Sequence, residues 1–325
     1  MEQLPGGVLH ALLLDGHGSA RALDQAALTS WQPQQGPLWV HLDYTDEGAW
    51  SWLSGLEDVP ANVVDSLLTM ETRPRVTRMG EGLLVYLRGV NLQPGAQPED
   101  MIAIRLWITA SRVISTQRRT LLSVTDMRTA LDKQEGPGSV GGIVTDLTDR
   151  LTWYMEDVIA HVEEQVSAAE ELVRTAMGAQ ARQQLSDLRR QCTVLRRYMA
   201  PQRDAISVLV QDPGGLLSED HRVIMREAAD RLLRLLEDLD SAREHASIAM
   251  EELTTALSDR LNRRLYVLAV ITAMFLPLSF LTGMLGVNLG GIPGAESPHG
   301  FAWFAAGLLG LMVVIGVYLK RNRWL

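Results

Sequence analysis

The chain has 325 residues, 46% of them hydrophobic, with one cysteine and a formal net charge of −9. Residues 1–258 hold 24 Lys/Arg against 37 Asp/Glu, a net charge of −13, so this part lacks the clustered positive charge that nucleic-acid binding needs. An acidic surface concentrates cations or simply keeps a protein soluble. Cys192 alone excludes an internal disulfide and is expected to be a small helix residue in a reducing compartment.

Residues 1–142 are expected to form an α+β cytoplasmic domain, an α/β/α sandwich. Short apolar runs bounded by Gly, Pro or Asp predict strands, and runs with helical periodicity predict short helices packed on the sheet. The predicted strands are 8–14, 38–42, 83–92, 101–109 and 112–115, and the predicted helices are 49–56 and 61–70. No phosphate-binding glycine loop and no nucleophile motif is present, so the sequence predicts that the protein is not an enzyme.

Residues 143–217 are expected to form a helical hairpin. The glycine-rich run 136–142 marks its beginning, and the DPGG sequence at 212–215 ends it. The first helix, 144–177, carries many acidic side chains, and the second, 181–210, carries many arginines. These opposite charges predict that the two helices pair in an antiparallel hairpin.

Residues 218–264 are expected to form a long stalk helix. Small and apolar residues recur there at alternating spacings of three and four, the heptad pattern of a helix that packs lengthwise on others. This seam is Met225, Ala228, Leu232, Leu235, Leu239, Ala242, Ala246, Ala249, Leu253 and Ala256. No helix breaker appears before Pro277, so the stalk is expected to continue directly into the apolar segment that follows.

A second repeat on the stalk consists of four acidic residues, each seven positions after the last. They are Asp230, Glu237, Glu244 and Glu251, and we call them the acidic column. In a ring of subunits the column would form stacked acidic rings that attract cations and bind metal weakly. The alternative is an ordinary solvated helix face, with its charge neutralised by nearby arginines. These arginines are Arg231, Arg234 and Arg243.

Two charge-free segments near the C-terminus predict membrane spans. The 23 residues 265–287 and the run 301–319 are long enough to cross a hydrocarbon core of about 30 Å. We therefore expect a first span at 265–288, an external loop at 289–300, a second span at 301–319 and a basic tail at 320–325. Lys and Arg precede the first segment and follow the second, and they are absent from the loop between the two segments. This distribution places both termini in the cytoplasm. The alternative is a buried helical hairpin in a soluble protein.

Two membrane helices cannot enclose a water-filled path, so transport would require an oligomer with a shared axis. The alternative is a membrane anchor for a cytoplasmic metal sensor. The first span ends in Gly286-Val287-Asn288, and an amide oxygen is a suitable ligand for a hydrated divalent cation. Further candidate pore residues are Met284, Leu281, Ser279, Leu276, Leu268 and Leu265. For Ser279 the alternative is a hydroxyl bonded back to its own helix.

Metal-binding side chains form only weak patterns. Glu296 and His299 lie three apart in the predicted external loop, where they could attract incoming ions. Two other pairings are possible on helices: His161 with Glu163 or Glu164, and His245 with Glu244 or Glu252. For each, the alternative is a plain exposed polar residue. No Cys/His cage typical of a tight zinc site is present.

A long helix that enters a C-terminal span ending in Gly-x-Asn, followed by a short loop and a last span, resembles the CorA-type divalent-cation transporters. The resemblance extends over the whole chain and includes the strand Trp39-Val40-His41-Leu42-Asp43. It is most specific in the run PLSFLTG at 277–283 and in GVNLGGIPG at 286–294. The magnesium branch of the family has Gly-Met-Asn, whereas the GVNLGGIPG run is similar to the zinc-transport (ZntB) branch.

This resemblance implies a funnel-shaped homopentamer in the bacterial inner membrane, with the first span lining the pore and Asn288 forming the outer selectivity ring. It also implies uptake of Zn²⁺ together with protons, and tolerance of Cd²⁺, Ni²⁺ or Co²⁺. Zn²⁺ would be the cargo, and no resident cofactor is expected. Leu276 stands where the magnesium branch has a methionine collar. A Mg²⁺/Co²⁺ channel of the CorA type and a membrane-anchored metal sensor remain the alternatives.

Overall fold

The computed structural model describes residues 4–69, 73–174, 178–211, 215–286, 292, 294 and 297–321. The chain divides into two compact units, Met1–Met250 and Glu251–Leu325. Helix α7 (Glu219–Leu285) contributes to both units, and each unit is described separately below.

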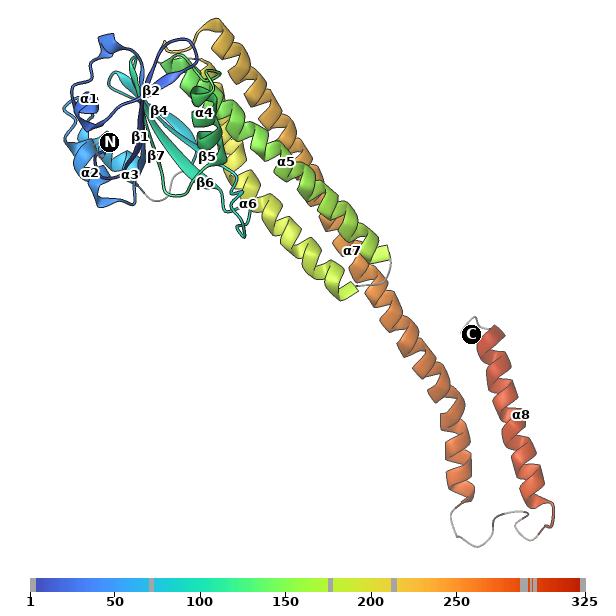
Figure 1. Ribbon diagram of the computed structural model, residues 1–325. Coiled ribbons are helices and arrows are strands. Elements are labelled where there is room, and N and C mark those ends of the chain that lie inside the picture. Colours follow the sequence, from blue (N-terminus) through green and yellow to red (C-terminus); the bar gives the residue numbers. More distant parts are fainter. Residues whose placement is uncertain are drawn as a thin grey trace. The chain divides into compact units, whose positions relative to one another are not determined.

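The first unit contains a seven-stranded sheet with the strand order β2-β1-β3-β7-β6-β5-β4 (Figure 1). Only the central β3–β7 pair is parallel, with Trp39 opposite Val113 and His41 opposite Ser115; the other pairs are antiparallel. The strands are β1 (Val8–Leu14), β2 (Ala20–Ala22), β3 (Leu38–Asp43), β4 (Arg75–Met79), β5 (Gly82–Gly89), β6 (Ile102–Ile108) and β7 (Arg112–Gln117).

Helices cover both faces of the sheet, because the central strands are apolar on both sides. Leu38, Val40 and Leu42 of β3 share one apolar cluster with the short helices α1, α2 and α3, while Trp39 packs on the opposite side with α4 and α5. The expected α/β/α sandwich is therefore confirmed. The helices are α1 (Gln25–Thr29), α2 (Glu47–Ser54), α3 (Ala61–Leu68), α4 (Leu122–Asp132) and α5 (Val140–Arg174), and a 3₁₀ turn spans Pro33–Gln35.

Sequence periodicity missed four elements of this domain, β2, β4, α1 and α4. β2 and α1 are very short, and the edge strand β4, with the sequence RVTRM, is polar and only partly buried. α4 begins after Leu121, which provides no side-chain cap, so its start carries no local signal. All five predicted strands exist, but β5 ends at Gly89, three residues before the predicted end.

Helix α5 begins four residues earlier than predicted, inside the run expected to interrupt the chain. Gly141 lies within this helix, and a Cβ atom there would be only 2.4 Å from the Leu216 carbonyl oxygen. The glycine is therefore a close-packing residue beside the segment that leads into α7. Local composition could not distinguish this use of glycine from a loop.

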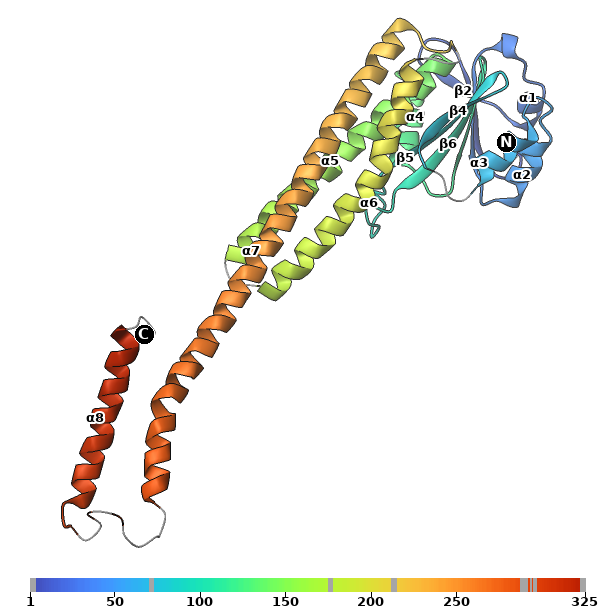
Figure 2. The ribbon, with the colours of Figure 1, turned by 180° about the vertical axis from the view of Figure 1, so that it is seen from behind.

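Helices α5, α6 (Gly178–Val210) and the first part of α7 form a three-helix bundle within the first unit (Figure 2). Nine of the ten predicted seam residues are buried; Ala256 is exposed. Cys192 is buried among the apolar residues of this bundle, and burial raises the pKa of its thiol to about 11. Its role as a small helix residue is confirmed.

The α5–α6 hairpin exists, and ion pairs also link each of its helices to α7. Arg196 of α6 lies 2.7 Å from Asp240 of α7, and Arg231 of α7 lies 2.9 Å from Asp149 of α5. Each outer helix therefore forms ion pairs with α7, and α5 meets α6 through the apolar cluster.

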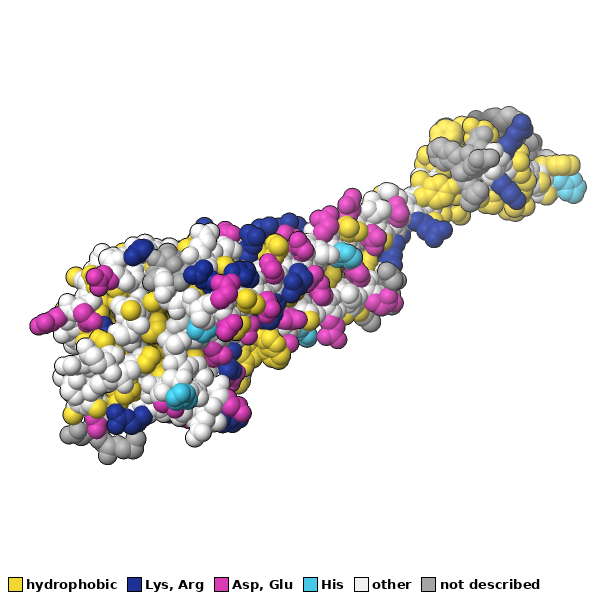
Figure 3. Space-filling model, turned by 90° about the horizontal axis from the view of Figure 1, so that it is seen from above, with side chains coloured by type: hydrophobic (Ala, Val, Ile, Leu, Met, Phe, Trp, Pro, Cys, Tyr) yellow, Lys and Arg dark blue, Asp and Glu magenta, His cyan; other side chains and the backbone are white. Residues whose placement is uncertain are grey.

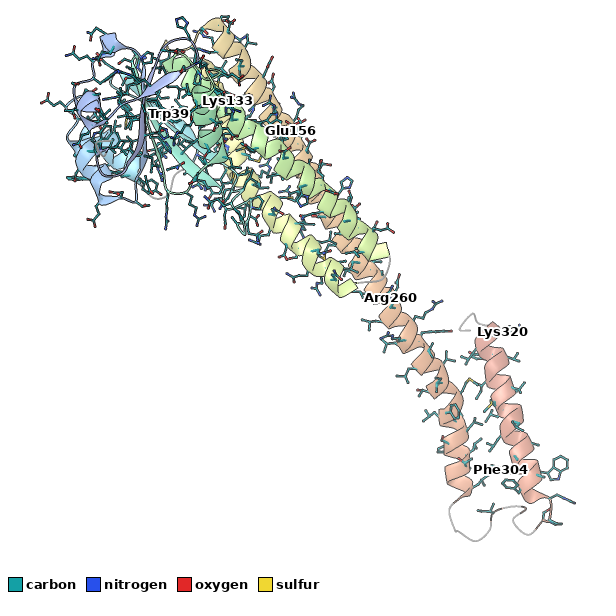
Figure 4. The ribbon with its side chains drawn as sticks, viewed as in Figure 1. Trp39, Lys133, Glu156, Arg260, Phe304 and Lys320 are labelled. Carbon is teal, nitrogen blue, oxygen red and sulfur yellow. The ribbon has the colours of Figure 1, made fainter. Side chains whose placement is uncertain are left out.

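The second unit contains the last part of α7 and helix α8 (Gly300–Arg321). α7 continues through Pro277 without interruption and ends at Leu285. Figure 4 shows Arg260 of α7 and Lys320 of α8 toward the same end of the two helices, with Phe304 toward the other end. Basic residues therefore cluster at one end of this helical hairpin, as the predicted membrane orientation requires.

Candidate functional site

The apolar segments of α7 and α8 are long enough and apolar enough to cross a membrane, and within the single chain they are almost entirely exposed. Leu276 and Phe280 are each 67% exposed, and Phe301 is 82% exposed. Figure 3 shows this apolar surface in yellow, whereas acidic and basic side chains mix over the bundle. A soluble protein would bury such side chains, so the alternative of a buried hairpin has no support in the described part of the chain.

The continuous helix sorts the candidate pore residues into two sets. Leu265, Leu268, Leu276, Ser279 and Gly286 follow one another at spacings of three, eight, three and seven, so they lie along one face of α7. Gly286 lies just beyond the last helical residue.

Leu281 and Met284 form the second set, three residues apart on a different side of the same helix. Leu281 is partly buried and Met284 is 54% exposed. One straight helix cannot direct both sets toward the same axis. The sequence alone predicts residues of both sets as candidate pore residues.

The hydroxyl groups of Thr272, Ser279 and Thr282 differ in whether they donate to a carbonyl oxygen of their own helix. Thr282 donates to the carbonyl oxygens of Leu278 and Ser279, each at 3.0 Å, and Thr272 donates to that of Leu268 at 2.8 Å. These are the back-bonded hydroxyls expected in membrane helices. The Ser279 hydroxyl makes no such bond to any residue that the structure describes, and Ser279 is exposed. Among the Ser and Thr residues of this segment, Ser279 is therefore the one whose hydroxyl is not held by a carbonyl oxygen in the described part of the chain.

The far end of the hairpin is only partly described. Val287, Asn288 and Glu296 lie outside the described residues. In the described part, the end of α7 and the start of α8 enclose a cleft of about 760 Å³, with Thr282 and Gly286 on one side and Trp303 on the other. His299 is exposed, and its backbone carbonyl accepts from the Trp303 N–H at 3.1 Å.

All four members of the acidic column are exposed on α7. None of them forms an ion pair with another residue in the described ranges. Two of the three arginines proposed to neutralise them are engaged elsewhere, Arg231 with Asp149 and Glu156, and Arg243 with Asp240 at 3.9 Å. The column therefore keeps its negative charge and presents it to solvent.

Of the two predicted histidine pairings, the one between His161 and Glu164 is present, whereas His245 pairs with neither Glu244 nor Glu252 in the described part of the chain. His161 Nδ1 lies 3.5 Å from Glu164 on the exposed surface of α5, and His161 also contacts Gln165. His245 lies 3.4 Å from Glu170 of α5. Spacing along the chain could not identify Glu170, because it lies on another helix. No group of three or more His, Cys, Asp or Glu side chains able to hold a metal occurs among the described residues.

These features suit the passage of ions better than their capture. A conduction path must bind a cation weakly enough to release it, and isolated carboxylates on a helix face do this. Zinc held permanently would require a compact set of nitrogen, sulfur and carboxylate ligands.

Comparison with known proteins agrees with this arrangement over nearly the full chain. The family model described as CorA-like Mg²⁺ transporter protein matches residues 34–321. The chain is 40% identical over 324 residues to a Pseudomonas aeruginosa protein named divalent cation transporter CmaX, covering 98% of this chain and 97% of that one. It is 37% identical to the zinc transport protein ZntB of Pectobacterium atrosepticum, covering 98% and 96% of the two chains. The solved structure of full-length CmaX superposes with a TM-score of 0.85 at 37% identity, covering 99% of each chain.

Proposed function

Because the chain belongs to the CorA-like Mg²⁺ transporter family, we propose that it moves divalent cations across the inner membrane, with Zn²⁺ as the preferred cargo and inward movement of protons as the driving force. Helix α7 carries this proposal. A single helix presents four unpaired carboxylates at seven-residue spacing and then a charge-free segment that leads to Gly286-Val287-Asn288.

The transporting unit is a homo-oligomer, and the family resemblance favours a pentamer. One chain supplies only two spans, which cannot surround a water-filled path. Apolar side chains such as Leu276 are exposed in the single chain, and lipid or neighbouring subunits would cover them. Both termini lie in the cytoplasm, because basic residues flank one end of the hairpin and the sequence of the opposite loop has none.

The first set of α7 residues lines the path in this proposal. Leu265, Leu268 and Leu276 form apolar constrictions that close by excluding water, and Ser279 supplies a hydroxyl between them and the outer end. Asn288 forms the outer ring, where amide oxygens replace part of the hydration shell of the cation. Leu281 and Met284 then contact neighbouring helices or lipid.

The acidic column concentrates cations on the cytoplasmic side. Closely spaced carboxylates raise the local concentration of divalent cations most strongly at low ionic strength. No Asp, Glu or His occurs in residues 265–287, so proton coupling would depend on water and on the carboxylates outside the membrane.

The preference for zinc is supported by the GVNLGGIPG run at 286–294 and by similarity to the zinc transport protein ZntB. Transport of Cd²⁺, Ni²⁺ or Co²⁺ is expected with lower preference. The second candidate is a Mg²⁺/Co²⁺ channel, favoured by the description of the family model that matches the chain.

Ion entry into proteoliposomes tests these alternatives. The purified protein is reconstituted, and entry of Zn²⁺ and of Mg²⁺ is followed with internal dyes, with and without an inward proton gradient. Zinc entry that rises with the gradient is the expected result. Zinc entry indifferent to the gradient would contradict proton coupling, Mg²⁺ entry alone would favour the channel, and entry of neither ion would favour a membrane-anchored sensor.

A further inference from the structure

Positively charged side chains lie together along one edge of the sheet, the edge formed by the ends of the strands, in an otherwise acidic part of the chain. Because β3, β5 and β7 run in the same direction, their carboxyl ends meet at this edge, where β6 begins. This edge of an α/β sheet is a common place for ligands to bind. A cavity of about 140 Å³ lies there, and Tyr44, Arg88, Arg118 and Arg119 contribute to its lining.

Arg88, at the end of β5, is held in place from two sides. Its Nη1 donates to the carbonyl oxygen of Met101 at 2.8 Å, and its guanidinium lies 4.0 Å from the centroid of the Tyr198 ring. A guanidinium fixed in this way loses little further side-chain entropy when it binds a ligand.

Arg118 and Arg119 follow directly after β7 and are exposed. Neither forms an ion pair or a side-chain hydrogen bond with any residue in the described ranges. The backbone N–H of Tyr44 donates to the Gln117 carbonyl at 3.1 Å, which fixes the loop after β3 beside them. Arg105 adds a further positive charge, stacked 4.4 Å from the Tyr44 ring centroid.

Several guanidinium groups converge on one small cavity, in a region whose sequence carries a net charge of −13 over residues 1–258. Like charges at short range repel, and a bound anion would offset this repulsion. Arginine pairs with phosphate through two parallel hydrogen bonds, a geometry that lysine cannot reproduce. A cavity of 140 Å³ has about the volume of four to five liquid waters, which suits one phosphate group.

We propose that this cavity binds the phosphate group of a ligand, through the exposed guanidinium groups of Arg118 and Arg119 and the fixed guanidinium group of Arg88. The cavity is too small for a whole nucleotide, so only the phosphate end would enter and the remainder would lie outside. The phosphate belongs either to a soluble metabolite or to a phospholipid headgroup. The site is independent of the proposed cation path, because none of its residues lies on α7.

Titration calorimetry on the full-length protein in detergent tests the site with three probes: inorganic phosphate, ATP with EDTA present, and dioctanoyl phosphatidylglycerol. The variant Arg118→Gln/Arg119→Gln is compared with Arg21→Gln, which changes an exposed arginine on β2 in the same domain. We expect at least tenfold weaker binding in the double variant, a change of less than twofold in R21Q, and an intermediate loss in Arg118→Lys/Arg119→Lys.

The probes separate the two sources of phosphate. Binding of phosphate or ATP indicates a soluble ligand, and binding of the lipid alone indicates a headgroup; either outcome supports the site if the double variant weakens it selectively. Failure of all three probes to bind the unmodified protein would overturn the proposal. Equal weakening by R21Q would also overturn it, because that result would reflect overall charge.

Discussion

The imidazole rings of His10 and His41 stack inside the sheet domain with their centroids 5.0 Å apart. His41 Nδ1 lies 2.7 Å from the Ser115 hydroxyl oxygen, which also accepts from the Trp39 indole N–H at 2.8 Å. The Nε2 atom of each histidine is buried without a hydrogen-bond partner among the described residues. The two rings are therefore packed as neutral groups.

The pKa of His10 is lowered to about 2, first by burial and then by electrostatic repulsion from His41 and from Arg128 on α4. The pKa of His41 is lowered to about 4, mainly by burial, which outweighs the opposing effects of the Gln117 side chain and of the charge of Asp43. In the unfolded chain both rings bind protons near pH 6.5. The unfolded state therefore takes up more protons below that pH, and folding stability falls as the pH decreases.

We accordingly predict that the domain loses stability between about pH 6.5 and pH 4, by on the order of 3 kcal/mol from His41 alone. The thermal midpoint of the detergent-solubilised protein, followed by tryptophan fluorescence from pH 7.5 to 5, measures this loss. His10→Phe should flatten the pH dependence, and His17→Phe, at an exposed loop position, should leave it unchanged. An unchanged slope in His10→Phe would contradict the prediction.

The ion pair between Arg112 and Asp58 should matter more than the pair between Arg196 and Asp240. The Arg112 side chain is 6% exposed and lies 2.6 Å from Asp58, so Asp58→Ala leaves a buried guanidinium without its carboxylate. We expect a loss of about 2 kcal/mol in the free energy of unfolding, reduced from the fully buried case because Asp58 itself is exposed. Asp240→Ala should cost less than about 1 kcal/mol, because both partners are partly exposed. Equal losses in thermal denaturation would refute this ranking.

The stalk seam offers a matched pair of alanines. Ala246 is fully buried between helices, so Ala246→Leu forces extra volume into the bundle and should cost about 1–3 kcal/mol. Ala256 continues the same heptad pattern but is exposed in the chain, so Ala256→Leu should cost less than about 0.5 kcal/mol. Thermal unfolding by circular dichroism measures both. If Ala256→Leu proved as costly as Ala246→Leu, the seam would be buried along its whole length.

Asn288→Ala should lower zinc entry into proteoliposomes at least tenfold or remove the preference for zinc, while the protein elutes from gel filtration unchanged. The reason is the loss of the amide oxygen proposed as the outer ligand ring. Asn62→Ala, at an exposed position on α3, serves as the control and should leave zinc entry unaltered. Normal flux and normal selectivity in Asn288→Ala would remove that residue from the path.

Neutralising the acidic column, as D230N/E237Q/E244Q/E251Q, should reduce zinc entry several-fold at low ionic strength and much less at 0.5 M salt, because salt screens exposed charges. A control variant, E47Q/E57Q/E81Q/D100N, removes the same charge from exposed positions of the sheet domain and should have little effect. A similar reduction in both variants, or one that does not respond to salt, would argue for an ordinary solvated face.

Local periodicity identified most elements and several site features of this protein. Short bounded apolar runs predicted β1 and β3, heptad spacing predicted the buried seam of α7, and charge-free length predicted the two membrane segments. Each of these signals lies within one segment, because a helix or strand that buries one face repeats its apolar residues with its own structural period. The position of Asn288 at the end of the first span is likewise a sequence inference, since it lies outside the described residues.

Only the tertiary structure decided which of these surfaces meet. The parallel β3–β7 pair places His41 beside Ser115, 74 positions later, and helix packing places His245 beside Glu170. The arginine-lined cavity likewise combines the ends of separate strands. A period in the sequence reports that a face is buried and leaves open what covers it, because strand order and helix register depend on contacts between distant segments. The sequence by itself determined most of the elements and the membrane segments, and the fold determined the partners of their side chains.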